Sequence, residues 1–148
     1  MTADATTQAP RYVGFWKRVL AFLIDTLILV TVIAMIVFAI YGREYLRLAN
    51  EGRTLLFDVL VQGVLPAAAA ILFWRYRGAT PGKMLLSARI VDAETLGPPS
   101  TGQLIGRYFA YILSSIFMLG FIWIAFDKRK QGWHDKLAGT VVVCDEDD

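Results

Sequence analysis

The charged residues that interrupt the apolar runs of this sequence are the ones whose positions suggest chemistry. Asp25 lies within FWKRVLAFLIDTLILVTVIAM, residues 15–35, and the charged residue nearest to it is Arg18. An aspartate at the centre of a membrane helix costs about 2.5 to 3.5 kcal/mol on insertion scales, so an interaction or a function must offset that cost. Because Arg18 lies seven residues earlier, it shares a helical face with Asp25 at roughly 10 Å along the axis.

Two interpretations of Asp25 follow from its chemistry. In the structural interpretation, Asp25 forms an ion pair with Arg18 or Arg107, and the pair fixes how the helices pack. In the functional interpretation, the carboxylate exchanges a proton or a monovalent cation within a polar cavity, as intramembrane acids commonly do. The sequence leaves both interpretations open.

Polar residues also recur at helical spacing in two other apolar stretches. They are Asp58, Gln62 and Pro66 in one stretch, and Arg107, Tyr111 and Ser114 in the other. Helices with one polar face each can turn those faces together and leave their apolar faces to lipid. The pattern therefore predicts a helical bundle with a polar interior. Asp58 lies about one turn from the end of its helix, where an acid needs no function.

Three hydrophobic stretches can position these residues. They are residues 19–41, 55–74 and 104–126, each close to the ~20 residues that cross a membrane as a helix. The chain is 56% hydrophobic, with a mean hydropathy of +0.50, above the roughly 45 to 50% of soluble domains. The expected fold is an all-α integral membrane bundle of two full transmembrane helices and a third hydrophobic helical segment, with a small β element on the cytoplasmic side.

Composition and charge predict how the chain is divided and oriented. The polar stretch MTADATTQAP, residues 1–10, is expected to be a disordered leader, and residues 11–148 to form a single membrane domain. Arg11, Lys17 and Arg18 place the N-terminus in the cytoplasm by the positive-inside rule. In the second stretch Gly63, Ala67 and Ala70 form a small-residue patch suited to close helix contact.

The third hydrophobic stretch has two readings. The basic tail DKRKQGWHDK behind it favours the cytoplasm, so residues 104–126 would form a re-entrant helix pair, broken near Ser114-Ser115 or Gly120. The β-branched segment TVVVC agrees, because its natural partner is ARIVD in the strand-like MLLSARIVD before the stretch. A single third span with an exported tail is the alternative, and the sequence does not decide between them.

Two short segments outside the apolar stretches complete this picture. The tail GWHDKLAG has the pattern of a short amphipathic helix, with Trp133 and Leu137 on its apolar side and Gly139 at its end. Asp135 in this helix can accept from Arg107 or Lys83 and so hold the tail to the preceding loop. The segment GATPGKM does not fit a phosphate-binding loop. It is predicted to be a turn whose lysine lies at the membrane surface.

The sequence argues against an enzyme. One histidine and one cysteine are too few for a zinc site, which usually requires three or four protein ligands. Ser114 and Ser115, the obvious nucleophiles, lie inside an apolar segment. No cofactor is expected, and no nucleic-acid partner either, because the basic residues border the apolar runs as membrane anchors do.

Several of these segments together resemble the RDD family of small bacterial membrane proteins. The resemblance rests on KRVLAFLID, TPGKMLLSARIVD with a later arginine at Arg107, and RKQGWHDKLAGTVVV, which occur in the family's order across residues 14–143. The family's arginine and two aspartates match Arg18, Asp25 and Asp135. Family members are generally supposed to act in transport, and some are implicated in sodium/proton exchange.

The expected function follows from this resemblance and from the polar residues. The chain is expected to be a small transporter or cation/proton exchanger of the bacterial inner membrane, with Arg18, Asp25, Asp58, Gln62, Arg107 and Asp135 as its polar core. Three short apolar stretches leave little room for a monomeric carrier, so a homo-oligomer or a larger membrane complex is expected. The expected partners are membrane lipid, monovalent cations and protons. The alternative is a non-transporting accessory or assembly subunit of a larger membrane complex.

Overall fold

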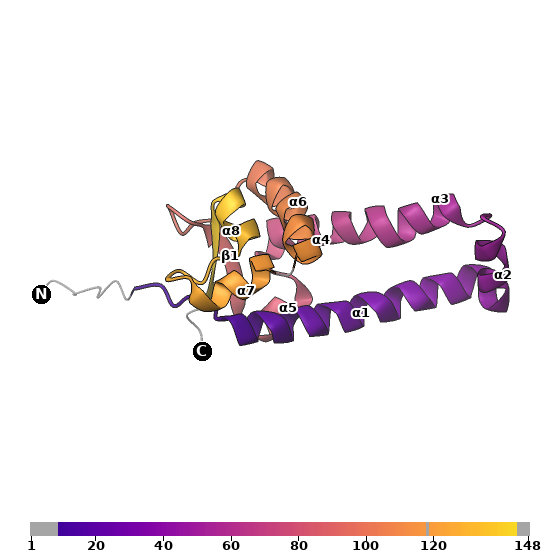
Figure 1. Cartoon of the computed structure of the whole chain (residues 1–148), viewed down its shortest axis with the longest axis horizontal. Coiled ribbons are helices and arrows are strands. Elements are labelled where there is room, and N and C mark those ends of the chain that lie inside the picture. The colour runs from indigo at the N-terminus through magenta and orange to yellow at the C-terminus, as the bar shows by residue number, and fades with distance from the viewer. Residues whose placement is uncertain (1–8, 118, 145–148) are drawn as a thin grey trace, which may run out of the picture.

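A long helical hairpin with a compact group of short elements at one end makes up the structure (Figure 1). The computed structural model describes residues 9–117 and 119–144. Most of the predicted disordered leader, residues 1–10, lies outside the described residues. In chain order the long elements are α1 (Phe15–Tyr41), α4 (Leu65–Arg77) and α6 (Thr101–Phe117).

Short elements connect and extend these helices. A 3-10 turn (Gly42–Glu44) and α2 (Tyr45–Asn50) form the hairpin loop, and α3 (Leu55–Asp58) and a π-helix (Val59–Val64) lead into α4. Between α4 and α6 lie two short elements, α5 (Pro81–Leu85) and β1 (Ala88–Asp92). After α6 the chain continues with α7 (Leu119–Phe126), α8 (Trp133–Ala138) and β2 (Thr140–Cys144). In Figure 1, α6, α7, α8 and β1 gather at the end opposite α2.

Among the described residues, two helical segments are long and apolar enough to cross a membrane, Phe15–Asn50 and Leu55–Leu85. This agrees with the two predicted full spans. The third segment is not straight, because Thr101–Ser114 of α6 and Leu119–Phe126 of α7 are bent by 103° relative to each other. The bend falls after Ser114 and before Leu119, within the range of the two breakpoints that the sequence suggested. Gly120 permits the tight return, since a Cβ there would lie 2.5 Å from the hydroxyl of Ser114.

The π-helix has a simple cause in the sequence. Pro66 has no N–H to donate and its ring would clash with the carbonyl of Gln62, which a regular helix could not tolerate. The wider turns of Val59–Val64 relieve that clash without ending the helix. Gly63 lies in this π-helix, and a Cβ added there would meet nothing within 4 Å. The close contact predicted at Gly63 is therefore wrong for a single chain, whereas Ala70 does pack on the core.

The two strands form the predicted pair. β1 and β2 are antiparallel, with Ile90 opposite Val142. The whole of MLLSARIVD was predicted to be strand-like, but Met84 and Leu85 belong to α5, and Leu86 and Ser87 form a turn before β1. The helix starts here because Pro81 provides a favourable first helical residue after Thr80. Residues 11–13 also join β2, with Val13 N–H donating to the Val142 carbonyl over 3.0 Å.

A small hydrophobic core joins the sheet to the helices. Its buried members are Val13, Trp74, Ala88, Ile90, Leu104 and Val142. They come from the segment before α1, from both strands, and from the ends of α4 and α6 that face the sheet. The compact end is thereby fixed to both membrane-length segments, whereas no residue in the most apolar window of either segment is buried.

Candidate functional site

Asp135 and two arginines form a buried charged cluster at the compact end. Arg18 Nη1 donates to Asp135 Oδ2, and Arg107 Nη1 donates to Asp135 Oδ1. Asp135 and Arg107 are both fully buried, and Arg18 is 7% exposed. Each side chain comes from a different element, namely α1, α6 and α8. The cluster therefore joins three segments that are remote in the sequence.

Further hydrogen bonds hold each arginine in place. Arg18 donates through Nη2 to the Lys130 carbonyl at 2.5 Å and through Nε to the Val13 carbonyl at 3.2 Å. Arg107 Nη1 also donates to the hydroxyl of Thr140 at 2.9 Å. Its Nε and Nη2 have no partner among the described residues. With two guanidiniums and one carboxylate, the cluster keeps an excess positive charge.

The electrostatics of the cluster fix its protonation. Burial alone would raise the pKa of Asp135, but the charges of Arg107 and Arg18 lower it well below its ordinary value. Asp135 is therefore ionised at neutral pH. The neighbouring His134 behaves differently, because burial lowers its pKa to about 3 despite the opposing effect of Asp135. His134 is neutral, and its ring lies against Tyr111 and Phe121.

Asp25 is held by uncharged donors instead of by an arginine. The Thr80 hydroxyl donates to Asp25 Oδ2 at 2.5 Å, and the Gly82 backbone N–H donates to Oδ1 at 2.7 Å. The predicted ion pair of Asp25 with Arg18 or Arg107 is wrong, because both arginines pair with Asp135. The reason is geometric: the short helix α5 packs directly on α1 and supplies donors to Asp25, while Arg18 is directed toward α8.

Gly82 is essential to this arrangement. A Cβ at this position would lie 2.2 Å from the Ala21 carbonyl of α1 and 3.0 Å from the Asp25 carboxylate. Such distances leave no space for any side chain, so only glycine lets α5 approach closely enough for its N–H to reach Asp25.

A small cavity lies between the Asp25 carboxylate and Arg18 of the buried charged cluster. Its volume is about 20 Å³, and its polar lining residues are Arg18, Asp25, Lys83, Tyr111 and His134. A cavity of this size has room for about one water molecule. Lys83 is buried, with its ammonium 5.9 Å from the Trp74 ring centre. The prediction that this lysine lies at the membrane surface is therefore wrong, since α5 turns it inward.

Asp58 and Gln62 lie apart from this site. Asp58 accepts from Tyr45, Thr54 and Gln62 at 2.7 to 2.9 Å, close to the hairpin loop. Figure 1 places α3, which contains Asp58, at the end of the hairpin opposite the compact group. The prediction that all the polar helix faces meet in one interior is therefore wrong, because this second cluster fixes the loop instead.

The sequence did not identify all the residues of the site. Thr80 and Gly82 carry no signal of their own, because a Thr-Pro-Gly sequence reads as a turn wherever it occurs. Thr140 and the buried His134 were likewise missed as members of the cluster. Within the described part of the chain, no group of three or more His, Cys, Asp or Glu residues could hold a metal ion.

The fold and the site define a helical membrane protein with a buried charged centre next to an aspartate of its first long helix. The chain belongs to the RDD family, whose sequence pattern matches residues 12–139.

Proteins similar to this chain occur in bacteria. "Uncharacterized protein RP437" of Rickettsia prowazekii is 43% identical over 103 residues, covering 68% of this chain and 58% of that protein. "Uncharacterized protein YxaI" of Bacillus subtilis is 37% identical over 153 residues, covering 88% and 95%. "Uncharacterized membrane protein YteJ" of the same species is 29% identical, covering 95% and 85%. No solved structure matches the chain.

Proposed function

We propose that this chain is a subunit of a small membrane transporter, in which Asp25 exchanges a proton or a monovalent cation. One observation carries the proposal. Both buried arginines are directed to Asp135, while among the described residues Asp25 is held only by the Thr80 hydroxyl and the Gly82 N–H beside a small cavity. An acid bound by neutral donors can accept a proton or cation without breaking an ion pair, whereas Asp135 cannot.

The two donors suggest which oxygen of Asp25 would be protonated. The Gly82 N–H can only donate, so Oδ1 must remain an acceptor. The Thr80 hydroxyl can either donate or accept, so it can turn and accept from a protonated Oδ2. Thr80 therefore lets both protonation states of Asp25 keep two hydrogen bonds. The charge can change without unpacking α5 from α1.

A transport path requires more than one chain. The cavity at Asp25 is only about 20 Å³, and the most apolar windows of the two membrane-length segments have no buried residues. We propose that a second copy of the chain or a partner subunit covers these surfaces and encloses the path. The protein would work in the bacterial inner membrane.

The orientation of the chain is part of the same proposal. Residues 11–13, β1 and β2 are joined by strand hydrogen bonds, so they must lie on the same side of the membrane. The basic residues around the start of α1 and at the end of α4 favour the cytoplasm for that side. They are Arg11, Lys17, Arg18, Arg75 and Arg77. In this arrangement α6 and α7 form a re-entrant pair and do not cross.

The second candidate function is a non-transporting accessory or assembly subunit. The observation that favours it is the apolar exposure of the hairpin, which would suit contact with a larger membrane protein. Leu56, Val59 and Val64, for example, are 53 to 74% exposed. This candidate requires no titration of Asp25.

A flux assay in proteoliposomes tests the transporter proposal. Asp25→Asn is a suitable variant, because the amide can still accept from Gly82 and can donate to the Thr80 oxygen. We expect it to insert normally but to lose cation-dependent proton flux, while Asp25→Glu keeps part of it. Asp58→Asn removes an acid from the loop cluster and is the matched control, with flux close to that of the wild type.

Two results would contradict the proposal. Wild-type liposomes that are silent to sodium, potassium and lithium gradients at acidic, neutral and alkaline pH would argue against exchange. Equal flux in wild type and Asp25→Asn would remove Asp25 from the mechanism. The accessory function instead predicts silent wild-type liposomes and co-purification of a partner that Asp25→Asn reduces.

A further inference from the structure

A second cavity lies at the end of α4, outside the Asp25 site. Its volume is about 250 Å³. One wall is the end of α4 with Gly78, a second is β1, and a third is the turn that contains Pro98 and Pro99. Gly78 O accepts from the Ile90 N–H at 2.7 Å, which fixes the helix end to the strand. The cavity is therefore bounded by elements that are firmly attached to one another.

Three arginines line this cavity, which we call the arginine pocket. They are Arg75 and Arg77 of α4 and Arg89 of β1, and none of the described residues that line it is acidic. Within the described part of the chain, Arg75 and Arg77 have no ion-pair partner. The carbonyl end of α4 contributes roughly half a negative charge. The guanidiniums of Arg75 and Arg77 outweigh it, so the pocket attracts anions.

Arg89 distinguishes this pocket from an ordinary basic helix end. Arginines at the end of a membrane helix are explained by topology alone, but Arg89 lies in a strand beyond α5. Its side chain crosses directly over Gly78, where an added Cβ would lie 2.8 Å from Arg89 Cγ. Gly78 also has φ +69°, so both its conformation and its lack of a side chain permit this crossing. The fold thus brings a third guanidinium to the two on α4.

The pocket lies where a membrane-length segment ends and polar structure begins. The segment Leu55–Leu85 contains its helical wall. Tyr76 and Leu96 line it and are 78% and 41% exposed. An exposed tyrosine with an exposed leucine is typical of the boundary between lipid tails and headgroups. Leu72 and Phe73, which precede the pocket's arginines along α4, are exposed and apolar. They give an acyl chain an apolar surface on which to pack.

We propose that the arginine pocket binds the phosphate of an anionic phospholipid, with the lipid's acyl chains lying along α4. Guanidinium groups bind phosphate oxygens with paired, charge-assisted hydrogen bonds, and they do so more specifically than lysines. A lipid bound here would join α4, β1 and the 96–99 turn, and would stabilise the compact end of the fold. This binding site is independent of transport through Asp25.

Lipid-dependent thermal stability of the purified full chain in detergent tests the proposal. Added phosphatidylglycerol should raise the Tm in a concentration-dependent way, because a ligand that binds only the folded state stabilises it. Phosphatidylcholine and inorganic phosphate at equal concentrations should have little effect. Arg75→Gln/Arg77→Gln and, separately, Arg89→Gln should each require about tenfold more phosphatidylglycerol for the same shift.

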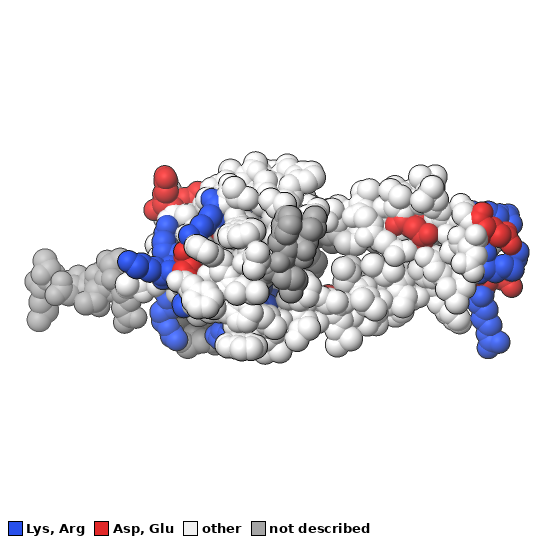
Figure 2. Space-filling model, in the orientation of Figure 1, with Lys and Arg blue, Asp and Glu red and all other residues white. Residues whose placement is uncertain are grey.

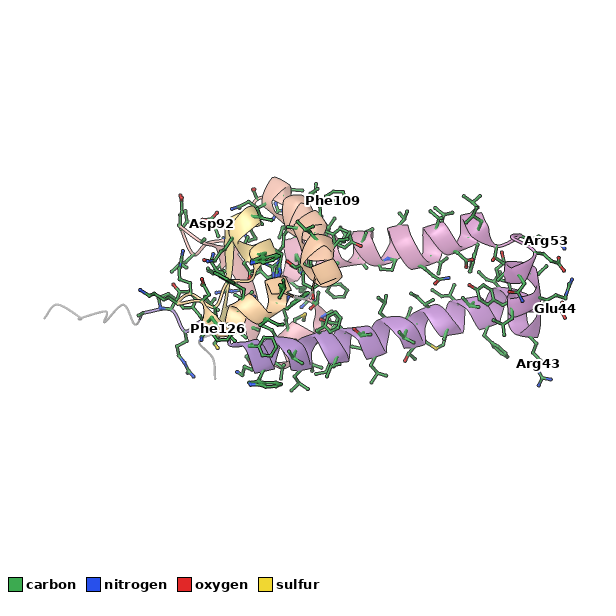
Figure 3. All side chains as sticks on the ribbon, viewed as in Figure 1. Arg43, Glu44, Arg53, Asp92, Phe109 and Phe126 are labelled. Atoms are coloured by element: carbon green, nitrogen blue, oxygen red, sulfur yellow. The ribbon has the colours of Figure 1, made fainter. Side chains whose placement is uncertain are left out.

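Arg43→Gln is the matched control, because Arg43 is an exposed arginine at the far end of the hairpin (Figure 3). It should keep the wild-type response. The proposal is overturned if phosphatidylcholine stabilises as well as phosphatidylglycerol, if inorganic phosphate alone does, or if Arg43→Gln weakens the response equally. If Arg89→Gln does not fold, the α4 double variant still decides the question, since both its arginines are exposed.

Discussion

At the scale of single residues, the two aspartates of this protein have opposite environments. Asp135 is fully buried between two arginines, so it keeps its charge and joins α1, α6 and α8. Asp25, within the part of the chain that the structure describes, accepts only from a hydroxyl and a backbone N–H. The same residue type therefore serves as a fixed link in one place and as a candidate exchanging group in the other.

The Arg18–Asp135 pair can be tested by a double-mutant cycle. Asp135→Asn is expected to lower the free energy of unfolding by roughly 3 to 5 kcal/mol, because it leaves two buried guanidiniums without their counter-charge. In an Arg18→Leu background the same change should cost less, with a coupling energy of about 0.5 to 3 kcal/mol. Chemical unfolding in detergent measures all four variants. A coupling of Arg18 with Asp25 that exceeds its coupling with Asp135 would contradict the assignment.

The neutral His134 makes stability depend on pH. Its pKa falls from the ordinary 6.5 to about 3 in the folded protein, so below about pH 6.5 the unfolded chain binds a proton that the folded chain does not. The stability that depends on neutral His134 is therefore complete above about pH 6.5 and is lost as the pH falls toward 3.

Replacing His134 should make the stability of the protein less dependent on pH. We expect His134→Gln to be less stable than the wild type at neutral pH, because a packed ring against Tyr111 and Phe121 is lost. Between about pH 6.5 and 4.5, however, its Tm should fall less steeply than that of the wild type. Thermal unfolding of both proteins across this pH interval measures the slopes. Parallel slopes would show that His134 does not control this part of the pH profile.

At the scale of elements, the close approach of α5 to α1 determines the geometry at Asp25. Gly82→Ala should destabilise the protein by about 1 to 3 kcal/mol, because its methyl group would overlap the Ala21 carbonyl. Gly63→Ala is the control, since its methyl group meets nothing and alanine favours helix by up to about 1 kcal/mol. Thermal unfolding in detergent compares the two. Equal Tm values would indicate that α5 can move away from α1 without cost.

Much of the element pattern was accessible from the sequence, and the failures have physical causes. Apolar length identified both long helices, and β-branched composition identified the pairing of β1 with β2. The short helix α8 and its end at Gly139, which has φ +67°, also followed from local signals. The helix α5 did not, because its five residues are too few for a periodic pattern and it is stabilised by packing on α1.

The partner of each charge could not be predicted in the same way. Helical spacing relates Arg18 to Asp25 only along one helix. It gives no information about which other element packs against that helix. The choice of Asp135 by both arginines depends on how α6 and α8 pack against α1, which is a tertiary property. The sequence thus offered Arg107 as a donor to Asp135, which the structure confirms, but it offered Arg18 only as a partner of Asp25.

At the scale of the whole molecule, charge and topology are consistent with each other. On the face shown in Figure 2, charged residues gather mainly at the two ends, with a largely uncharged surface between them. Figure 3 shows Arg43, Glu44 and Arg53 at the hairpin loop and Asp92 at the opposite end. Such a distribution suits a chain whose two ends lie in water and whose middle lies in lipid.

The pairing of β1 with β2 constrains where the C-terminal segment lies relative to the membrane. β1 precedes the bent pair of α6 and α7, and β2 follows it. Because the strands are hydrogen-bonded to each other, the topology proposed above has the chain return to the side from which it entered. A cysteine at Lys136, an exposed position of α8, should therefore lie on the same side as the N-terminus, for which we propose the cytoplasm.

Labelling of intact cells tests this topology. In a Cys144→Ser background, a cysteine at Lys136 should react with a thiol reagent only after the membrane is made permeable. A cysteine at Glu44, an exposed position of the hairpin loop, is the control and should react with an impermeant reagent in intact cells. Reaction of the Lys136 cysteine from outside would mean that α6 and α7 together cross the membrane, and that β1 and β2 cannot pair in the cell as they do here.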